Sequence, residues 1–237
     1  MGEFVPSMLK HIDAFIAPSH FVRDQYQASH LAITSLVLPH FFNSSPRQRA
    51  ATKRDYYLYV GRLERAKGLQ TLFRHFRDGL RRLVIAGSGT YEAELKRQGA
   101  GNPNVVFLGR VPHSELPRWY ADARATIIPS ICYETFGLPI LESLQQGTPV
   151  ITSHYGALPE IVGATGGGEV YREPEELEAA LARFDHHPEY ARQLGERGAA
   201  GLGPYSPEAH LREYMNLIER CRNRRTGGFD SNLCESQ

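Results

Sequence analysis

The sequence predicts an α/β fold: a Rossmann-like parallel sheet with helices on both faces. From residue 55 onward, short apolar runs alternate with segments whose apolar residues recur every three or four positions. This alternation is typical of βα units, in which parallel strands are covered on both sides. Several of the apolar runs are rich in Val, Ile and Tyr, as strands are. Strands are expected at 56–60, 83–86, 105–108, 126–129, 150–152 and, from a weaker pattern, 169–171.

Helical periodicity lies between these strands and continues after the last of them. Gly147 is suited to follow the end of a helix, with Pro149 preventing its continuation, and Ser206 with Pro207 is suited to begin one. Helices are therefore expected at 69–76, 91–98, 114–121, 138–146, 175–184, 188–198 and 206–222.

The two ends of the chain have patterns of their own. Near the start, a strand at 14–18 and a helix at 20–28 precede a second apolar run at 33–38. The segment 43–54 is polar and is expected to be an exposed loop, and the tail 223–237 is expected to be disordered.

Composition excludes several classes of protein. With 41% hydrophobic and 22% charged residues in 237, the chain as a whole is neither disordered nor fibrous. Its 27 Lys and Arg balance 26 Asp and Glu, so no general field exists for nucleic acid, and an anionic ligand must be held by a few placed groups. Three cysteines form no disulfide framework, and ten histidines form no metal-ligand pattern. The N-terminal residues lack a signal-peptide pattern, and no run of 18 apolar residues occurs, so a soluble protein of a reducing compartment is expected.

Two glutamates stand out in the stretch that leaves the strand at 126–129. Glu134 lies in the strand-to-helix loop, and Glu142 lies about one and a half turns into the following helix. Both can face one crevice at the carboxyl end of the sheet, and Glu142 suits two neighbouring hydroxyls such as those of a ribose. Backbone N–H groups of Phe136, Gly137 and Leu138 at the helix start suit a phosphate or a sugar hydroxyl. The alternative is that both glutamates are solvated charges, but the apolar residues beside Glu142 favour a buried helix.

Two cations and a glycine pair follow the first two strands of the sheet. Arg62 and Lys67 suit a diphosphate, the first by its planar fork and the second as a point charge, although loop cations are often only solvated. Gly87 and Gly89 follow a strand, but Glu92 occupies the third glycine position of a dinucleotide fingerprint, so that motif is incomplete. Gly87 is equally suited to a tight structural turn and to lining a phosphate site.

A loop-to-helix junction at 156–161 carries one more acidic group. Glu160 either faces the ligand or stabilises the dipole of its own helix. The histidines His75, His113, His154, His186 and His187 are interpreted as loop or surface residues.

Taken together, six strings resemble the family 4 retaining glycosyltransferases of the GT-B fold. They are VGRLERAKGL at 60–69, LVIAGSG at 83–89, VVFLGRV at 105–111, PSICYETFGLPILE at 129–142, GTPVITS at 147–153 and GALPEIV at 156–162. The resemblance spans most of residues 13–222 and implies transfer of a sugar, with retention of anomeric configuration, from a UDP-, GDP- or ADP-linked donor to an acceptor sugar or lipid-linked sugar. It implies no metal or other cofactor, because cations and helix amides hold the departing diphosphate.

The same resemblance assigns roles to individual residues. Arg62 and Lys67 match the diphosphate-binding cations, and Glu134 and Glu142 match an acidic pair near the donor sugar and on the ribose. Glu134, Arg62 and Lys67 are the expected catalytic residues. The remaining expected donor-binding residues are Gly87, Gly109, Arg110, Val111, Phe136, Gly137 and Leu138, of which 109–111 lie against the base.

The resemblance also predicts the domain organisation. Residues 1–32 resemble the end of an N-terminal acceptor domain, 33–205 the nucleotide-sugar domain, and 206–222 the helix that crosses back, followed by the tail 223–237. Such a chain would be the donor half of an enzyme, cytoplasmic or peripheral at the inner membrane face, with the acceptor half supplied elsewhere. A non-catalytic nucleotide-sugar-binding or regulatory module is the alternative, and an epimerase or phosphorylase of the same fold is a third. Apolar surface is expected at 13–19 and on the last helix.

Overall fold

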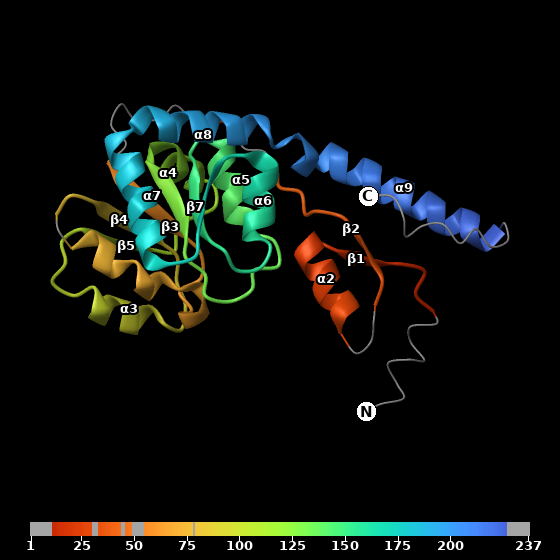
Figure 1. The fold of residues 1–237 in the computed structure, drawn as a ribbon, viewed down its shortest axis with the longest axis horizontal. Coiled ribbons are helices and arrows are strands. Elements are labelled where there is room, and N and C mark those ends of the chain that lie inside the picture. Colours follow the sequence, from red (N-terminus) through yellow and green to blue (C-terminus); the bar gives the residue numbers. More distant parts are fainter. Residues whose placement is uncertain (1–10, 30–32, 44–45, 49–54, 78, 227–237) are drawn as a thin grey trace.

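The protein is built on a six-stranded sheet in which every neighbouring pair of strands is parallel (Figure 1). The computed structural model describes residues 11–29, 33–43, 46–48, 55–77 and 79–226. The strand order is β5-β4-β3-β6-β7-β8. The strands are β3 (Tyr56–Val60), β4 (Arg82–Ala86), β5 (Val105–Gly109), β6 (Ala125–Ile128), β7 (Val150–Ser153) and β8 (Gly168–Tyr171). The predicted α/β fold class is thus confirmed, and the predicted strand positions agree within two residues.

Strand order reverses between β3 and β6. The chain runs outward from β3 through β4 to β5, then returns to place β6 on the other side of β3. At such a switch point the loops leave the two neighbouring strands in opposite directions, which opens a crevice at their carboxyl ends. The loops after β3 and β6 therefore border this crevice.

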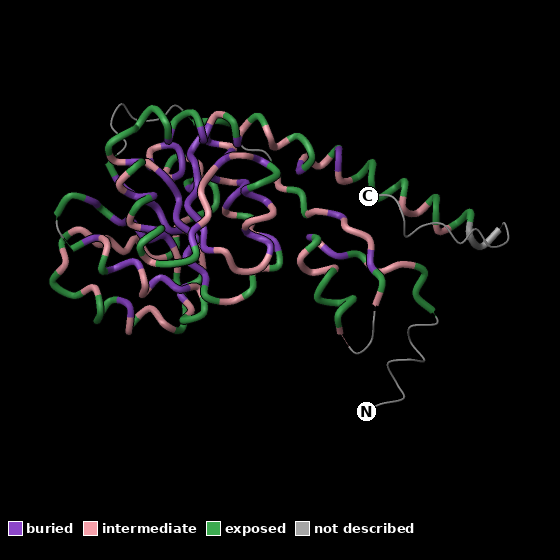
Figure 2. Tube along the Cα trace, viewed as in Figure 1, coloured by how far each residue is buried: buried purple, intermediate pink, exposed green. Residues whose placement is uncertain are grey.

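Both faces of the sheet are buried, which explains its apolar strands. Alternate residues of β3 belong to different cores: Tyr57 and Tyr59 face one side, and Tyr56 and Leu58 face the other. Figure 2 shows that the buried residues concentrate in this sheet and the helices on it. The first core includes residues of α3 (Glu92–Gln98), α7 (Pro174–His186) and α8 (Pro188–Ala200); the opposite side includes residues of α4 (Leu116–Asp122), α5 (Leu138–Gln145) and α6 (Leu158–Thr165).

One predicted helix is wrong. The segment 69–76 forms two short 3₁₀ helices, η2 (Leu69–Thr71) and η3 (Phe73–Phe76), after a first one, η1 (Arg65–Lys67). Its apolar residues are buried as predicted, with Leu69, Leu72 and Phe76 at 0% exposure. A repeat of three to four residues fits a 3₁₀ helix as well as an α-helix, so the pattern predicted the buried face but not the pitch.

The first strands form a separate small unit. β1 (Phe15–Ala17) and β2 (Ser35–Val37) pair in parallel in a sheet of their own, with α2 (His20–Ala28) between them in the chain. Figure 1 shows this unit beside the main sheet. The apolar run at 33–38, which is expected to begin the nucleotide-sugar domain, contains the strand that pairs with β1. The boundary predicted between residues 32 and 33 would divide this βαβ unit.

The last helix, α9 (Pro207–Thr226), extends past the main domain (Figure 1). As predicted, Ser206 caps it, accepting from the backbone N–H of Ala209 at 3.1 Å. The helix continues through 223–226, where the sequence predicted disorder. The rest of that tail, and residues 44–45 and 49–54 of the loop predicted at 43–54, lie outside the described residues. Leu211, Tyr214 and Met215 are 59%, 41% and 48% exposed, so the helix carries the expected apolar surface.

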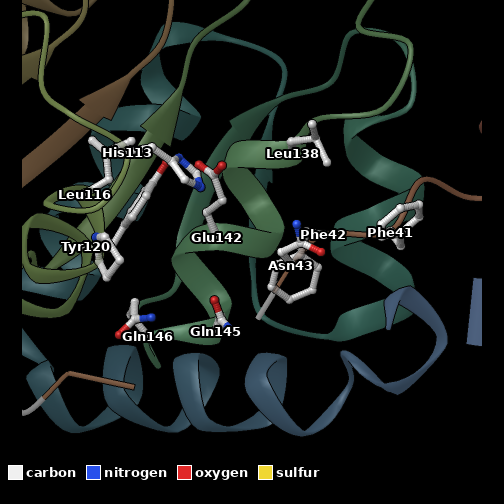
Figure 3. Close-up of a pocket in the computed structure, with 11 residues that line it drawn as sticks. Phe41, Phe42, Asn43, His113, Leu116, Tyr120, Leu138, Glu142, Gln145 and Gln146 are labelled. Carbon is white, nitrogen blue, oxygen red and sulfur yellow. The ribbon is translucent and has the colours of Figure 1, made fainter. Parts of the chain in front are cut away.

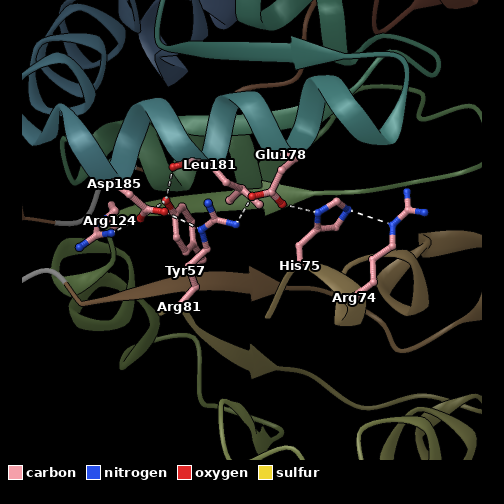
Figure 4. Close-up of polar contacts among 8 residues, drawn as sticks. All are labelled: Tyr57, Arg74, His75, Arg81, Arg124, Glu178, Leu181 and Asp185. Atoms are coloured by element: carbon pink, nitrogen blue, oxygen red, sulfur yellow. Dashed lines mark hydrogen bonds and ion pairs between the residues drawn. The ribbon is translucent and has the colours of Figure 1, made fainter. Parts of the chain in front are cut away.

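A chain of ion pairs anchors α7 to the sheet (Figure 4). Asp185 accepts from Arg81 at 2.5 Å and from the hydroxyl of Tyr57 at 2.9 Å. Glu178, two turns earlier, pairs with Arg81 at 2.5 Å and with His75 at 2.7 Å. His75 was expected in a loop or at the surface, but its side chain lies in η3 and is only 8% exposed, because it is enclosed by this network. Arg81 has a side chain only 7% exposed, and its two carboxylate partners compensate for that burial.

Candidate functional site

A lysine and a glutamate meet where the loops after β3 and β6 converge. The ammonium group of Lys67 lies 2.7 Å from the carboxylate of Glu134, and their side chains are 22% and 17% exposed. Ser130 also donates a hydrogen bond to this carboxylate. Backbone contacts fix both loops: Ile131 donates to the carbonyl of Ala66 at 3.0 Å. The structure therefore brings together two residues 67 positions apart that the sequence assigned to one site.

Arg62 leaves the same sheet edge directly after β3. Its side chain is exposed, while its carbonyl accepts a hydrogen bond of 2.7 Å from the hydroxyl of Tyr59. Burial raises the pKa of Tyr59, and the negative charge of Glu134 adds to the effect, whereas the charge of Arg62 opposes it. Tyr59 thus remains a neutral donor, and Arg62 and Glu134 lie close enough to act on one hydroxyl.

Glycines allow the turns after β3 and β4 to touch. A Cβ atom on Gly87, whose φ is +154°, would lie 1.8 Å from the carbonyl oxygen of Gly61. One on Gly89 would lie 2.4 Å from the carbonyl oxygen of Leu63. This close packing is sufficient to explain Gly87, which the sequence left open between a structural turn and a phosphate site. Its role in donor binding stays a prediction.

The turn after β5 lies next to these glycines. Gly109, with φ +71°, accepts a hydrogen bond of 2.8 Å from the backbone N–H of Gly87. Arg110 is exposed, and Val111 is partly buried against the core around Tyr56. The structure places 109–111 at the predicted sheet edge, with Val111 also serving packing.

Helix α5 carries the other predicted groups. Gly137 precedes it with φ +109°, and Phe136 is buried beneath it at 4% exposure, whereas Leu138 is 42% exposed. Because the first N–H groups of a helix lack partners within it, this end favours an anion. The ring of Phe136 therefore belongs to the core, and the role of its backbone in donor binding stays a prediction.

Glu142 faces a cavity of about 240 Å³ between α4, α5 and the segment 41–43 (Figure 3). The hydroxyl of Tyr120 donates to its carboxylate at 2.7 Å. Burial and the charge of Glu142 raise the pKa of Tyr120 well above its ordinary value, so this hydroxyl remains a donor. Figure 3 also shows the imidazole of His113 facing the Glu142 carboxylate. This arrangement leaves part of an oriented carboxylate open to a ligand.

Sequence reasoning missed Tyr120 and His113 as site residues. Tyr120 sits on the apolar side of a predicted helix and so gave the signal of a core residue; it is indeed 1% exposed, but its hydroxyl reaches the site. His113 was interpreted as an isolated loop histidine, and it is exposed in a loop, yet it lines the same cavity as Glu142. Only the packing of α4 on α5 brings them to Glu142.

Glu160 has a role that neither sequence interpretation described. Its carboxylate accepts from the backbone N–H groups of His20 and Phe21, at 3.0 and 3.2 Å, at the N-terminus of α2. It therefore complements the dipole of α2, in addition to that of its own helix α6, in whose first turn it lies as the sequence suggested. Beside it, Ser19 donates to the carbonyl of Thr135 at 2.9 Å. These bonds join the small βαβ unit to the loop that holds Glu134.

The predicted acidic pair is divided between two environments. Glu134 is held by Lys67 at the switch point, whereas Glu142 is held by Tyr120 in the cavity, and α5 connects the two. Within the described ranges, no three His, Cys, Asp or Glu side chains are grouped to hold a metal ion. The site's chemistry rests on two cations, a helix end and two oriented carboxylates, a combination suited to a phosphorylated, hydroxylated ligand.

Comparison with known proteins gives one family. The model of the family described as glycosyl transferases group 1 matches residues 41–200. The O-antigen chain mannosyltransferase B of Escherichia coli is 34% identical over 139 residues, which cover 54% of this chain and 35% of that protein. The D-inositol 3-phosphate glycosyltransferase of Thermobifida fusca is 31% identical over 188 residues, which cover 70% of this chain and 43% of that protein. The chain thus spans less than half the length of these relatives.

Solved structures show the same fold. A sucrose-phosphate synthase from Thermosynechococcus elongatus has a TM-score of 0.77 at 25% identity. The superposition covers 90% of this chain and 59% of the synthase. The Anabaena protein HepE, solved in complex with UDP and glucose, has a TM-score of 0.78 at 18% identity, covering 87% of this chain and 63% of its own. At such identity the second likeness concerns the fold alone.

Proposed function

This chain belongs to the glycosyl transferases of group 1, and from that premise we propose that it supplies the donor site for transfer of a sugar from a nucleotide diphosphate. We place it with the retaining family 4 enzymes, as their donor-binding half. The observation that carries the proposal is the pair formed by Lys67 and Glu134, 2.7 Å apart at the switch point of the sheet. It lies in the crevice where sheets of this kind bind their ligands.

In this proposal, two cations hold the diphosphate. Glu134 forms an ion pair with Lys67 in the protein described here. A diphosphate carries more negative charge than one carboxylate and would compete with Glu134 for the ammonium group of Lys67. Arg62, exposed beside it, adds a bidentate donor. Transfer builds negative charge on the departing diphosphate, and these cations, with the N–H groups at the start of α5, would stabilise that charge where it forms.

The nucleoside is assigned to the groups on either side of that anion. Glu142, oriented by Tyr120, would accept hydrogen bonds from the ribose hydroxyls, and the backbone of 109–111 would lie against the base. Gly87, Phe136, Gly137 and Leu138 would contribute backbone to phosphate and sugar. Glu134, released from Lys67, would face the donor sugar. The chemistry needs no metal in this proposal, since fixed cations supply the positive charge.

The acceptor half is proposed to meet this chain on its small unit and α9. Ile12 and Ile16, each 41% exposed, lie in or next to β1, and α9 exposes Leu211 and Met215. The acceptor would be a sugar or a lipid-linked sugar, and the proposed setting is the cytoplasm or the inner membrane face. Across the described residues, no helix is both long enough and apolar enough to cross a bilayer.

Thermal shift with UDP-, GDP- and ADP-linked sugars tests the donor site. A ligand present at a hundred times its Kd stabilises by about 2.7 kcal/mol, which for a domain of this size raises Tm by roughly 5–10 °C. Lys67→Ala and Glu142→Ala should reduce that rise. His186→Ala, at an exposed position near the end of α7, is the matched control and should leave it unchanged.

The possible outcomes separate the competing functions. If no nucleotide sugar raises Tm at millimolar concentration, the proposed donor site is wrong. Binding that persists without sugar transfer to any acceptor, even when an acceptor domain from a relative is added, favours the non-catalytic binding module.

A further inference from the structure

A second cavity, of about 530 Å³, lies beside η2 (Leu69–Thr71), and neither Lys67 nor Glu134 lines it. Ligand sites of small molecules have volumes of roughly 300–1,000 Å³, so its size is suitable. It opens at the carboxyl ends of β6, β7 and β8 and is walled by η2, η3 and the first turn of α7. None of the residues assigned to the nucleotide sugar lines it. Its lining includes Arg74, Arg77, Arg172, Phe73, Tyr155 and Tyr171.

The charged side chains of this cavity are of one sign. Its lining contains three arginines and a histidine but no Asp or Glu. Within the described part of the chain, the side chains of Arg74 and Arg172 form no ion pair with a carboxylate. Two arginine forks around one space suit a phosphate group, which offers several oxygens to bidentate donors.

The carboxylates on either side of the lining residue Leu177 in α7 already have partners. Glu178 is bound by His75 and Arg81, and Glu176 accepts from the backbone N–H of Arg172 at 2.6 Å as part of the cap of α7. The hydrogen bond from the backbone N–H of Arg172 lowers the pKa of Glu176, and the charge of Arg172 adds to this effect without an ion pair between the two. Figure 4 shows Arg74 at the end of the ion-pair chain, with its two terminal nitrogens pointing away from His75. Those nitrogens are thus available to a ligand.

Aromatic side chains form the apolar part of the wall. Tyr171 is 8% exposed, and burial raises the pKa of its hydroxyl, while Arg74 lies near enough to oppose the effect and Tyr155 to add to it. The hydroxyl of Tyr171 therefore stays protonated beside a guanidinium group. Together with Phe73, which is 4% exposed, these rings give the cavity an aromatic wall for the ring of a sugar or a base.

We propose that this cavity is a second ligand site, which binds a phosphate monoester carrying a ring, with Arg74 and Arg172 on the phosphate and Tyr155 and Tyr171 beside the ring. Sugar phosphates and nucleoside monophosphates share this chemistry. The cavity also reaches the donor site through one residue: Ser130 lines it and donates to Glu134. The proposal stands on these residues alone and does not require that the donor-site assignment be correct.

Isothermal titration of the 237-residue chain with four probes tests the site. Glucose 6-phosphate and AMP represent the two sources of the monoester, inorganic phosphate lacks the ring, and glucose lacks the charge. We expect one monoester to bind at least tenfold more tightly than inorganic phosphate, and glucose not to bind. Arg74→Gln and Arg172→Gln should each weaken that monoester about tenfold, as loss of a charge-assisted hydrogen bond does.

Three controls make the result decisive. Arg118→Gln removes an arginine whose side chain is 85% exposed on α4, away from the cavity, and should leave affinity unchanged. Glu142→Ala alters the proposed ribose site. If this variant abolishes AMP binding and Arg74→Gln leaves it intact, AMP binds at the donor site, and the proposal is overturned. Unchanged thermal unfolding of the arginine variants shows that they fold. The proposal is also overturned if no monoester binds at millimolar concentration, or if all the arginine variants bind the monoester with equal affinity.

Discussion

The hydroxyl of Tyr120 is predicted to hold Glu142 in the position that a ribose needs. Tyr120 is 1% exposed, donates to the carboxylate at 2.7 Å, and stays protonated because its pKa is raised. In Tyr120→Phe the ring still fills its place in the core, and only the hydrogen bond is lost. The perturbation therefore acts on the orientation of the carboxylate and little on packing.

The size of the effect follows from the exposure of the two partners. A hydrogen bond to a charged group contributes about 1.5–3 kcal/mol, and the lower end applies because Glu142 is partly exposed and regains water. That loss corresponds to a decrease in Tm of roughly 3–6 °C for a domain of this size. If nucleotide binding needs the same orientation, the dissociation constant should rise about tenfold, which corresponds to about 1.4 kcal/mol.

Tyr56→Phe is the matched control. Its hydroxyl donates to the carbonyl of Trp119 at 2.8 Å in the same core, and this hydrogen bond involves no residue assigned to the nucleotide sugar. Chemical denaturation and titration with the best nucleotide from the thermal screen should show both variants destabilised and only Tyr120→Phe weakened in binding. In a Glu142→Gln background, Tyr120→Phe should have a much smaller effect on binding, because the pair acts as a unit. Equal binding losses in the two tyrosine variants, or none in Tyr120→Phe, would refute this reasoning.

Three further perturbations have outcomes that the contacts determine. Glu160→Gln removes the charge from the N-terminus of α2 and should speed amide hydrogen exchange at His20 and Phe21, with exchange in β3 as the internal reference; unchanged exchange would contradict the contact. Gly87→Ala should destabilise the protein by well over 3 kcal/mol, because the new Cβ meets the backbone of Gly61. Gly79→Ala is also at positive φ but in open space, and it should cost only about 1 kcal/mol. Similar unfolding midpoints of the two variants in urea would show that the structure relieves the close approach. Burial alone would raise the pKa of Glu178, but hydrogen bonds from His75 and Arg81 prevail and lower it. The ionised Glu178 therefore stabilises the fold fully above the ordinary carboxyl pKa, and this stabilisation is lost as the pH falls below that value. The free energy of unfolding should decline more steeply below about pH 5 in the wild type than in Glu178→Gln, and parallel curves would contradict this assignment.

The sequence alone located most of the secondary structure because its strands are buried on both faces. Runs such as the one at 56–60 are apolar at every position, and this signal needs no knowledge of neighbours. The sequence was less informative where one spacing of apolar residues fits more than one structure. Apolar spacing at 69–76 fits two kinds of helix, and the short run at 33–38 fits any sheet, so neither the 3₁₀ turns nor the pairing of β2 with β1 could be predicted.

What the sequence determined by itself is the set of candidate groups: its spacing placed Arg62 and Lys67 after one strand and Glu134 and Glu142 around the end of another. Tertiary structure decided which of them meet. The reversal of strand order put the ends of β3 and β6 side by side and joined Lys67 to Glu134. The packing of α4 on α5 then gave Glu142 a partner in Tyr120, which no local pattern indicated. The physical reason is that propensity and periodicity describe how a segment is buried, whereas a site depends on contacts between segments, and those are fixed only when the whole sheet forms.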